Sequence, residues 1–103
     1  MFKLFSRNTA ITTKELENDL FNKTVLDVRT PGEYRTGHIS NAKNIPLDKI
    51  AAYAGPTEIP VYVICQSGMR SKRAVGILKK KGYTAINVRG GMSQWTGTIK
   101  GGK

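Results

Sequence analysis

The sequence contains one cysteine, Cys65, and one histidine, His38, among its 103 residues. A lone cysteine cannot form an intramolecular disulfide, and a metal site built on thiolates normally needs several cysteines. This scarcity favours a reducing compartment. We therefore expect a cytoplasmic protein that has no metal site and needs no cofactor.

Long apolar runs are also missing. No stretch approaches the ~18 apolar residues that a membrane span requires, and Lys3 and Arg7 interrupt the few apolar residues at the N-terminus, so no secretory signal is predicted. We expect no membrane partner. Because 103 residues leave room for one compact unit, we also expect a single domain over residues 1–103.

Negative charge is scarce too. Lysine and arginine number 17 against 7 acidic residues, and no acid follows Glu58. A net charge of +10 is compatible with nucleic-acid binding. However, the lysines are scattered and no aromatic residues are interleaved with them as a stacking platform. We therefore expect no nucleic-acid partner, and instead a basic surface that small anions approach.

Short strand and helix patterns alternate along the chain. Strands are predicted over residues 25–28, 42–45, 61–64 and 85–88. Helices are predicted after the capping boxes that begin at Thr12 and Thr30, over residues 47–53, between residue 71 and Gly82, and over residues 92–95. This alternation indicates an α/β fold in which parallel strands are joined by right-handed crossovers.

The strand predicted over residues 61–64 leads directly into a loop at Cys65, and a helix follows. In parallel sheets ligands bind beyond the carboxyl ends of the strands. A glycine-containing loop before a helix can direct its backbone N–H groups at an anion. If that anion is the Cys65 sulfur, its pKa falls and the thiolate becomes a nucleophile, and Arg70 and Lys72 act in the same direction. The alternative is that Cys65 is a small buried apolar residue.

Three ordered segments resemble the signatures of the rhodanese family. Residues 26–29 with 33–39 and 42–47 are similar to its first signature, residues 65–71 to its active-site loop, and residues 90–95 to its closing segment. The resemblance covers about residues 12–96. It implies a single rhodanese-like domain with a central, mostly parallel, five-stranded sheet that has helices on both faces.

The resemblance also implies the activity of a thiosulfate sulfurtransferase. Cys65 would accept the outer sulfur of thiosulfate or of a persulfide donor, and hold it as a persulfide until a thiol or cyanide removes it. A protein could serve as donor or acceptor, and we expect a monomer. The sequence leaves open which donor and acceptor are used, and whether the chain acts as an enzyme or as a sulfur carrier.

Substrate binding is assigned by the same resemblance to the residues after the cysteine. These are Gln66, Ser67, Gly68, Met69, Arg70 and Ser71. The amides of residues 66–70 would surround the persulfide, Gly68 would allow the tight turn, and Arg70 would bind the anionic donor.

Four further residues are expected to support this loop: Asp27, Arg29, Glu33 and His38. Asp27 lies in a buried strand and needs a partner such as Arg29. His38 could carry protons, but we expect a hydrogen-bonded turn residue. Asn41 replaces a glycine that is usual in the family, and because asparagine tolerates the left-handed conformation the turn should survive.

Two other functions compete with sulfur transfer. A cysteine phosphatase or arsenate reductase also surrounds an oxyanion with a thiolate and an arginine. Four residues separate Cys65 from Arg70 here, whereas phosphatases carry five, so the shorter loop favours a single sulfur atom. A binding module without activity is disfavoured because such modules tend to lose the cysteine.

Overall fold

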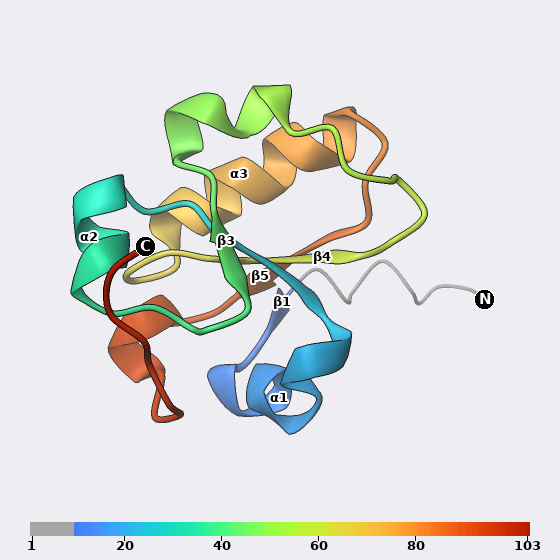
Figure 1. Cartoon of the computed structure of the whole chain (residues 1–103). Helices are drawn as coiled ribbons and strands as arrows, with labels where there is room; N and C mark the ends of the chain where they lie inside the picture. Colours follow the sequence, from blue (N-terminus) through green and yellow to red (C-terminus); the bar gives the residue numbers. More distant parts are fainter. Residues whose placement is uncertain (1–9) are drawn as a thin grey trace.

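The described part of the chain, residues 10–103 of a computed structural model, contains one five-stranded sheet (Figure 1). The strands are β1 (Ala10–Ile11), β2 (Thr24–Asp27), β3 (Ala42–Asn44), β4 (Val61–Ile64) and β5 (Ala85–Val88). Their order is β1-β5-β4-β2-β3, and all neighbours are parallel. The expected five-stranded α/β sheet is confirmed. The sequence pattern did not predict β1, because two residues are too short to show an alternation.

Within residues 10–103, six helical segments lie between the strands or after the last one. They are α1 (Thr13–Asn18), the 3-10 helix η2 (Leu20–Asn22), α2 (Pro31–Thr36), the 3-10 helix η3 (Leu47–Ala52), α3 (Met69–Lys80) and the 3-10 helix η4 (Gly91–Gln94). Both capping boxes are formed. The hydroxyl of Thr30 accepts from the Glu33 amide at 3.2 Å, and the Glu33 carboxylate accepts from the Thr30 amide at 2.9 Å. Gly82 follows α3 with φ 98°, as the predicted helix end requires.

Helices cover both faces of the sheet, with α3 and η3 on one face and α1 and η4 on the other (Figure 1). Successive strand residues alternate between the two cores. Leu26 and Val63 face α3 and η3, whereas Val25 and Ile64 face α1 and η4. The sheet is therefore buried on both sides, which explains why its strands read as continuous apolar runs.

The carboxyl ends of β2 and β4 lie side by side. Asp27 is paired in register with Ile64, and the Val28 amide donates to the Ile64 carbonyl at 2.9 Å. Cys65 follows β4 at this edge. The segment after β2 therefore flanks the cysteine loop.

Asn41 precedes β3 and contributes through its side chain. Its amide group donates to the carbonyls of Leu20 and Lys23 at 3.0 and 3.2 Å. The start of β3 is thereby tied to η2. The N-terminal segment, for which no secretory signal is predicted, lies outside the described residues, and within residues 10–103 no helix is long and apolar enough to cross a membrane.

Candidate active site

Cys65 is buried, with 1% of its surface exposed, and its sulfur lies inside the turn of the following loop. The sulfur accepts hydrogen bonds from the amides of Gly68 at 3.0 Å and Ser71 at 3.3 Å. Gly68 caps α3 and has φ 103°, a left-handed conformation that glycine adopts readily. The loop and the first turn of α3 thus direct backbone donors at one atom.

The electrostatics of this loop favour the thiolate. Burial alone would raise the pKa of Cys65, because the charged form loses solvent. The hydrogen bond between the sulfur and the Ser71 hydroxyl, together with those from the amides of Ser71, Gly68 and Ser67, outweighs burial, so the pKa lies below its usual value. A larger fraction of the sulfur is then ionised at neutral pH, which makes it a better nucleophile.

Ser71 connects the sulfur to the neighbouring strand. Its fully buried hydroxyl lies 3.4 Å from the Cys65 sulfur and donates to the side-chain oxygen of Asn87 in β5. The Asn87 amide nitrogen in turn reaches the Gly68 carbonyl at 3.5 Å. Sequence reasoning missed Asn87. The available signal was a polar residue within an otherwise apolar strand.

The start of η4 supports the back of the loop. The amides of Met92 and Ser93 donate to the carbonyls of Cys65 at 2.8 Å and Gln66 at 2.9 Å. Gly91 has φ 59°, and a Cβ on it would lie 2.3 Å from the Cys65 carbonyl oxygen. Gly91 is therefore a point of close backbone approach, which the sequence did not indicate.

Arg70 is bound by Glu33. Its two terminal nitrogens donate to the two carboxylate oxygens at 2.7 and 2.9 Å. The hydrogen bond from Arg70 is the main reason why the pKa of Glu33 is lowered to about 2, and the same contact raises the pKa of Arg70. This carboxylate compensates an arginine placed unfavourably near a helix N-terminus. The sequence predicted both residues but not their pairing.

Asp27 and Arg29 form a buried ion pair, with 0% and 3% of their surfaces exposed. An Arg29 terminal nitrogen lies 2.9 Å from a carboxylate oxygen of Asp27. Arg29 also donates to the Gly37 carbonyl at 2.8 Å and to the side-chain oxygen of Gln66 at 3.3 Å. The expected partner of Asp27 is therefore the observed one, and the pair braces the first residue after Cys65.

His38 contacts α2 and the C-terminal segment. Its Nδ1 lies 2.7 Å from the Tyr34 carbonyl oxygen, and the two rings stack with centroids 3.6 Å apart. The backbone of His38 pairs with that of Lys100. The contacts recorded for His38 are therefore with α2 and the C-terminal segment, and they do not include the cysteine loop that it was expected to support.

The remaining loop side chains point outward. Gln66 and Ser67 are exposed, and 72% of the Met69 surface is accessible. These three residues therefore border the site, and the contact of Ser67 with the sulfur comes from its backbone amide.

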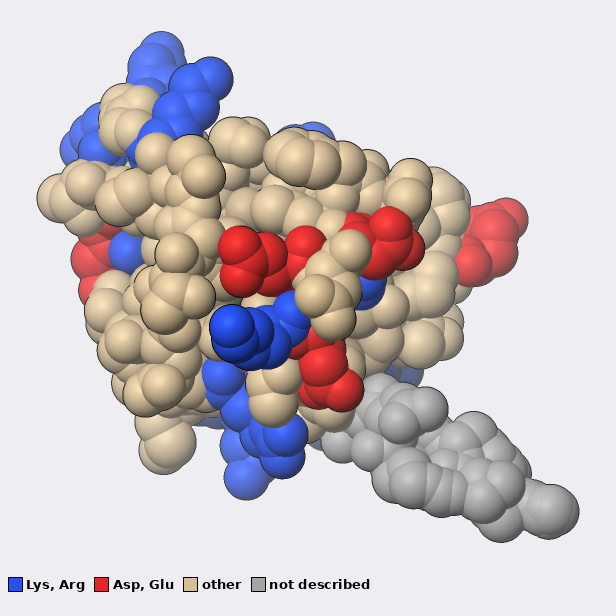
Figure 2. Space-filling model, turned by 90° about the horizontal axis from the view of Figure 1, so that it is seen from below, with Lys and Arg blue, Asp and Glu red and all other residues tan. Residues whose placement is uncertain are grey.

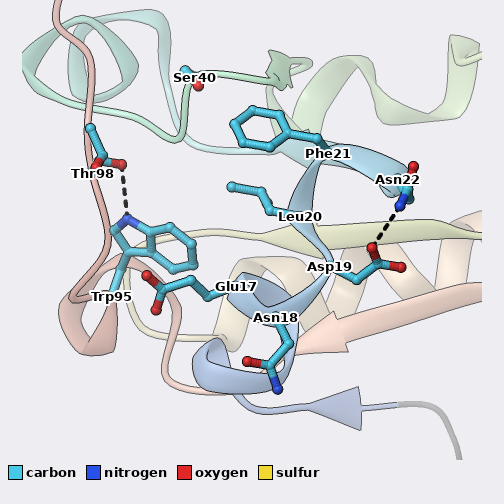
Figure 3. A pocket seen from close by; sticks show the side chains of 9 residues that line it. All are labelled: Glu17, Asn18, Asp19, Leu20, Phe21, Asn22, Ser40, Trp95 and Thr98. Carbon is cyan, nitrogen blue, oxygen red and sulfur yellow. Dashed lines mark hydrogen bonds between the residues drawn. The ribbon is translucent and has the colours of Figure 1, made fainter.

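A hollow of about 450 Å³ lies away from the cysteine, between α1, η2 and Trp95 (Figure 3). Its lining includes the carboxylates of Glu17 and Asp19 and no lysine or arginine. Figure 2 shows acidic side chains on the face that α1 covers, with lysine or arginine side chains among them. Trp95 packs against the core.

Across residues 10–103, no three or more His, Cys, Asp or Glu side chains are grouped so that they could hold a metal ion. At this edge of the sheet the structure places the hydrogen-bonded sulfur of Cys65.

Comparison with known proteins identifies the family. The sequence matches the model of the rhodanese-like domain over residues 12–98. The chain belongs to the rhodanese-like domain family. A solved rhodanese-like domain protein from Staphylococcus aureus superimposes with a TM-score of 0.84 at 36% identity, over 92% of this chain and 99% of that one.

Relatives of this rhodanese-like domain include proteins named for sulfur chemistry. The uncharacterized protein YqhL of Bacillus subtilis is 40% identical over 96 residues, which is 90% of this chain and 76% of YqhL. The thiosulfate sulfurtransferase PspE of Escherichia coli is 37% identical over 71 residues, 65% of this chain and 68% of PspE. Three longer relatives are a putative sulfur carrier protein, a probable molybdopterin-synthase adenylyltransferase, and an adenylyltransferase and sulfurtransferase. The chain spans only 41%, 24% and 20% of their respective lengths. The names of these relatives and of PspE support sulfur transfer as the general activity.

Proposed function

We propose that this rhodanese-like domain is a thiosulfate-type sulfurtransferase that carries sulfur as a persulfide on Cys65. The observation that carries the proposal is the set of hydrogen bonds on one buried sulfur, from the Gly68 and Ser71 amides at 3.0 and 3.3 Å. These donors stabilise negative charge where a thiolate or a terminal persulfide sulfur would sit. The relationship to PspE supports thiosulfate as a donor.

In the loading step the Cys65 thiolate attacks the outer sulfur of thiosulfate. The new bond joins this sulfur to Cys65, and the sulfur–sulfur bond of thiosulfate breaks with its electron pair on the departing sulfite. The product is a Cys65 persulfide anion, and no oxidant is needed. Arg70 offers N–H groups not used by Glu33 to the sulfonate oxygens of the donor.

In the second step a thiolate or cyanide attacks the outer sulfur of the persulfide. The bond to Cys65 breaks and its electron pair returns to the Cys65 sulfur, which regenerates the thiolate. The loop therefore stabilises the Cys65 thiolate in both steps: as the attacking group in the first step and as the leaving group in the second.

The test is intact-protein mass spectrometry after incubation with thiosulfate, with Cys65→Ser in parallel and a cyanide chase afterwards. We expect the wild type alone to gain the mass of one sulfur atom and to lose it to cyanide. A gain of equal size on Cys65→Ser would refute the assignment of Cys65. Hydrolysis of an aryl phosphate that depends on Cys65, with no sulfur gain, would favour a phosphatase instead.

A further inference from the structure

The Ser71 hydroxyl lies between two groups that can each use its single proton. It is fully buried, 3.4 Å from the Cys65 sulfur and 2.5 Å from the side-chain oxygen of Asn87 in β5. A hydroxyl has one proton to donate and two lone pairs with which to accept. The side-chain oxygen of Asn87 can only accept, so the proton points to Asn87 when that bond is made. The Ser71 oxygen then presents a lone pair to the sulfur.

The orientation of the Asn87 amide follows from its second contact. Its nitrogen donates to the Gly68 carbonyl at 3.5 Å. The reversed amide would place two acceptor oxygens against each other, which is unfavourable. The Gly68 carbonyl also accepts from the Lys72 amide at 3.2 Å. It therefore keeps a partner when Asn87 is replaced.

The charge on Cys65 decides whether this arrangement suits the sulfur. A thiol can donate its own proton to the Ser71 oxygen, which gives a chain of hydrogen bonds from Cys65 through Ser71 to Asn87. A thiolate has no proton to donate, and a lone pair of Ser71 would face its negative charge. The hydroxyl proton must then turn from Asn87 to the sulfur. The thiolate and Asn87 therefore compete for one proton.

The surroundings of Asn87 and Ser71 allow this exchange. The Asn87 side chain is half-buried and lines a hollow of about 460 Å³ between α3 and β5, so solvent can replace the lost hydrogen bond. A fully buried acceptor would instead be left unsatisfied, which is much less favourable. Ser71 is held in the first turn of α3, and its amide donates to the sulfur at 3.3 Å whichever way the hydroxyl proton points. Only the hydroxyl proton has to move.

Charged side chains surround the sulfur and Asn87 on every side. They are Asp27 and Arg29 after or within β2, Glu33 in α2, Arg70, Lys72 and Lys79 in α3, and Arg89 after β5. Replacing Asn87 with a neutral residue leaves all of these charges in place. A change in the titration of the sulfur can then be assigned to the hydrogen bond.

We propose that Asn87 is a positioning residue that holds the Ser71 proton away from the Cys65 sulfur, and that this proton turns to the sulfur when Cys65 becomes a thiolate. For its role in turnover the proposal rests on the sulfur-transfer function proposed above. In the persulfide the negative charge lies on the outer sulfur, so the proton returns to Asn87. When the persulfide bond breaks and its electron pair returns to Cys65, the proton turns to the sulfur again. Asn87 thus limits how far the loop stabilises the thiolate.

Asn87→Leu tests the proposal, because leucine has a similar size and cannot accept a hydrogen bond. The hydroxyl then donates to the thiolate without competition, so the pKa of Cys65 should fall. Below the midpoint of the wild-type pH profile, alkylation by iodoacetamide should be about two- to fivefold faster. Above the midpoint, the limiting rate should fall by a smaller factor, because a more stable thiolate is a weaker nucleophile. If Asn87 only oriented Ser71, its loss would raise the pKa instead.

The double variant Ser71→Ala/Asn87→Leu tests the route of the effect. Because Asn87 acts through the Ser71 hydroxyl, its replacement should change nothing once that hydroxyl is absent. The double variant should therefore have the pH profile of Ser71→Ala. Asn18→Leu, at an exposed position in α1, is the matched control and should have the wild-type profile.

An unchanged or upward-shifted profile in folded Asn87→Leu would overturn the proposal. A downward shift of equal size in the Ser71→Ala background would also overturn it, since Asn87 would then act by another route. Urea denaturation shows whether Asn87→Leu is folded. If it is not, Asn87→Val replaces it in both comparisons, because valine also lacks an acceptor and suits a strand. Alkylation needs no sulfur donor, so a missing persulfide after incubation with thiosulfate would refute the proposed function without affecting this result.

Discussion

The carboxylate of Glu33 in α2 holds the guanidinium of Arg70 in α3 through two hydrogen bonds of 2.7 and 2.9 Å. This contact joins the helix after β2 to the end of the cysteine loop. It also means that an anionic donor meets an arginine whose charge is already offset. We therefore expect the ion pair to limit how strongly the proposed site attracts thiosulfate.

Glu33→Gln should strengthen thiosulfate binding. Glutamine preserves the capping box with Thr30, because its side-chain oxygen still accepts from the Thr30 amide, but it removes the charge that competes for Arg70. We expect KM for thiosulfate to fall about two- to fivefold, as measured by initial rates of sulfite release. Glu58→Gln, which removes an exposed acid outside the site, is the control. An increase in KM would show that Glu33 helps to bind the donor.

The same pair should make stability depend on pH. The pKa of Glu33 is lowered to about 2 from an ordinary 4.5. A depressed carboxyl pKa gives stability that is present above the unfolded-state value and is lost as the pH falls through the folded-state value. Between about pH 4.5 and 2, the wild type should therefore lose more unfolding free energy than Glu33→Gln. Urea denaturation at several pH values measures this difference.

Ser71→Ala should make Cys65 less reactive. The pKa of Cys65 is lowered despite burial, and the Ser71 hydroxyl is the strongest of the hydrogen bonds that lower it. Without the hydroxyl the pKa rises, so less thiolate is present at neutral pH. Alkylation by iodoacetamide at pH 7 should slow, and its pH profile should move upward. Ser40→Ala, at an exposed site away from the loop, should match the wild type, and an unchanged profile in Ser71→Ala would contradict this account.

Asp27→Asn should destabilise the protein strongly. The change leaves Arg29 buried and charged without its carboxylate, and breaking a buried pair typically costs about 3–5 kcal/mol. Chemical denaturation gives the free energy of unfolding. For Asp19→Asn, which weakens the contact of this exposed carboxylate with Lys23 at 4.0 Å, the loss should stay below about 1 kcal/mol.

Two glycine-to-alanine changes should have opposite effects. At Gly91 a Cβ would meet the Cys65 carbonyl oxygen at 2.3 Å, so Gly91→Ala should push η4 from the loop and lower both stability and sulfur loading. At Gly76, inside α3, a Cβ meets nothing within 4 Å. Gly76→Ala should therefore raise stability by about 0.5–1 kcal/mol, because alanine favours the helix. Thermal unfolding of both variants tests the pair.

The features of this fold that could be predicted from the sequence are determined by residues that lie close together in the chain. The capping box at Thr30, the end of α3 at Gly82 and the strand before Cys65 each show their pattern within a few residues. Local spacing and periodicity are enough for such features.

The contacts that complete the candidate site could not be predicted in this way. Glu33 and Arg70 are 37 residues apart, and Ser71 and Asn87 are 16 apart. The two residues of such a pair come into contact only when the strands have taken their order in the sheet. That order cannot be inferred from the sequence of any single segment. A charged or polar residue beside an apolar run indicates that this residue needs a hydrogen-bonding or charged partner. It does not indicate which residue that partner is.

The support that η4 gives to the loop has a consequence for the growing polypeptide. The amides of Met92 and Ser93 hold the carbonyls of Cys65 and Gln66, so the sulfur's surroundings are built from both halves of the chain. Any fragment that ends before Met92 carries Cys65 without this support. A nascent chain that stops before Met92 would thus lack this support, and the cysteine loop would gain it only after η4 has been synthesised.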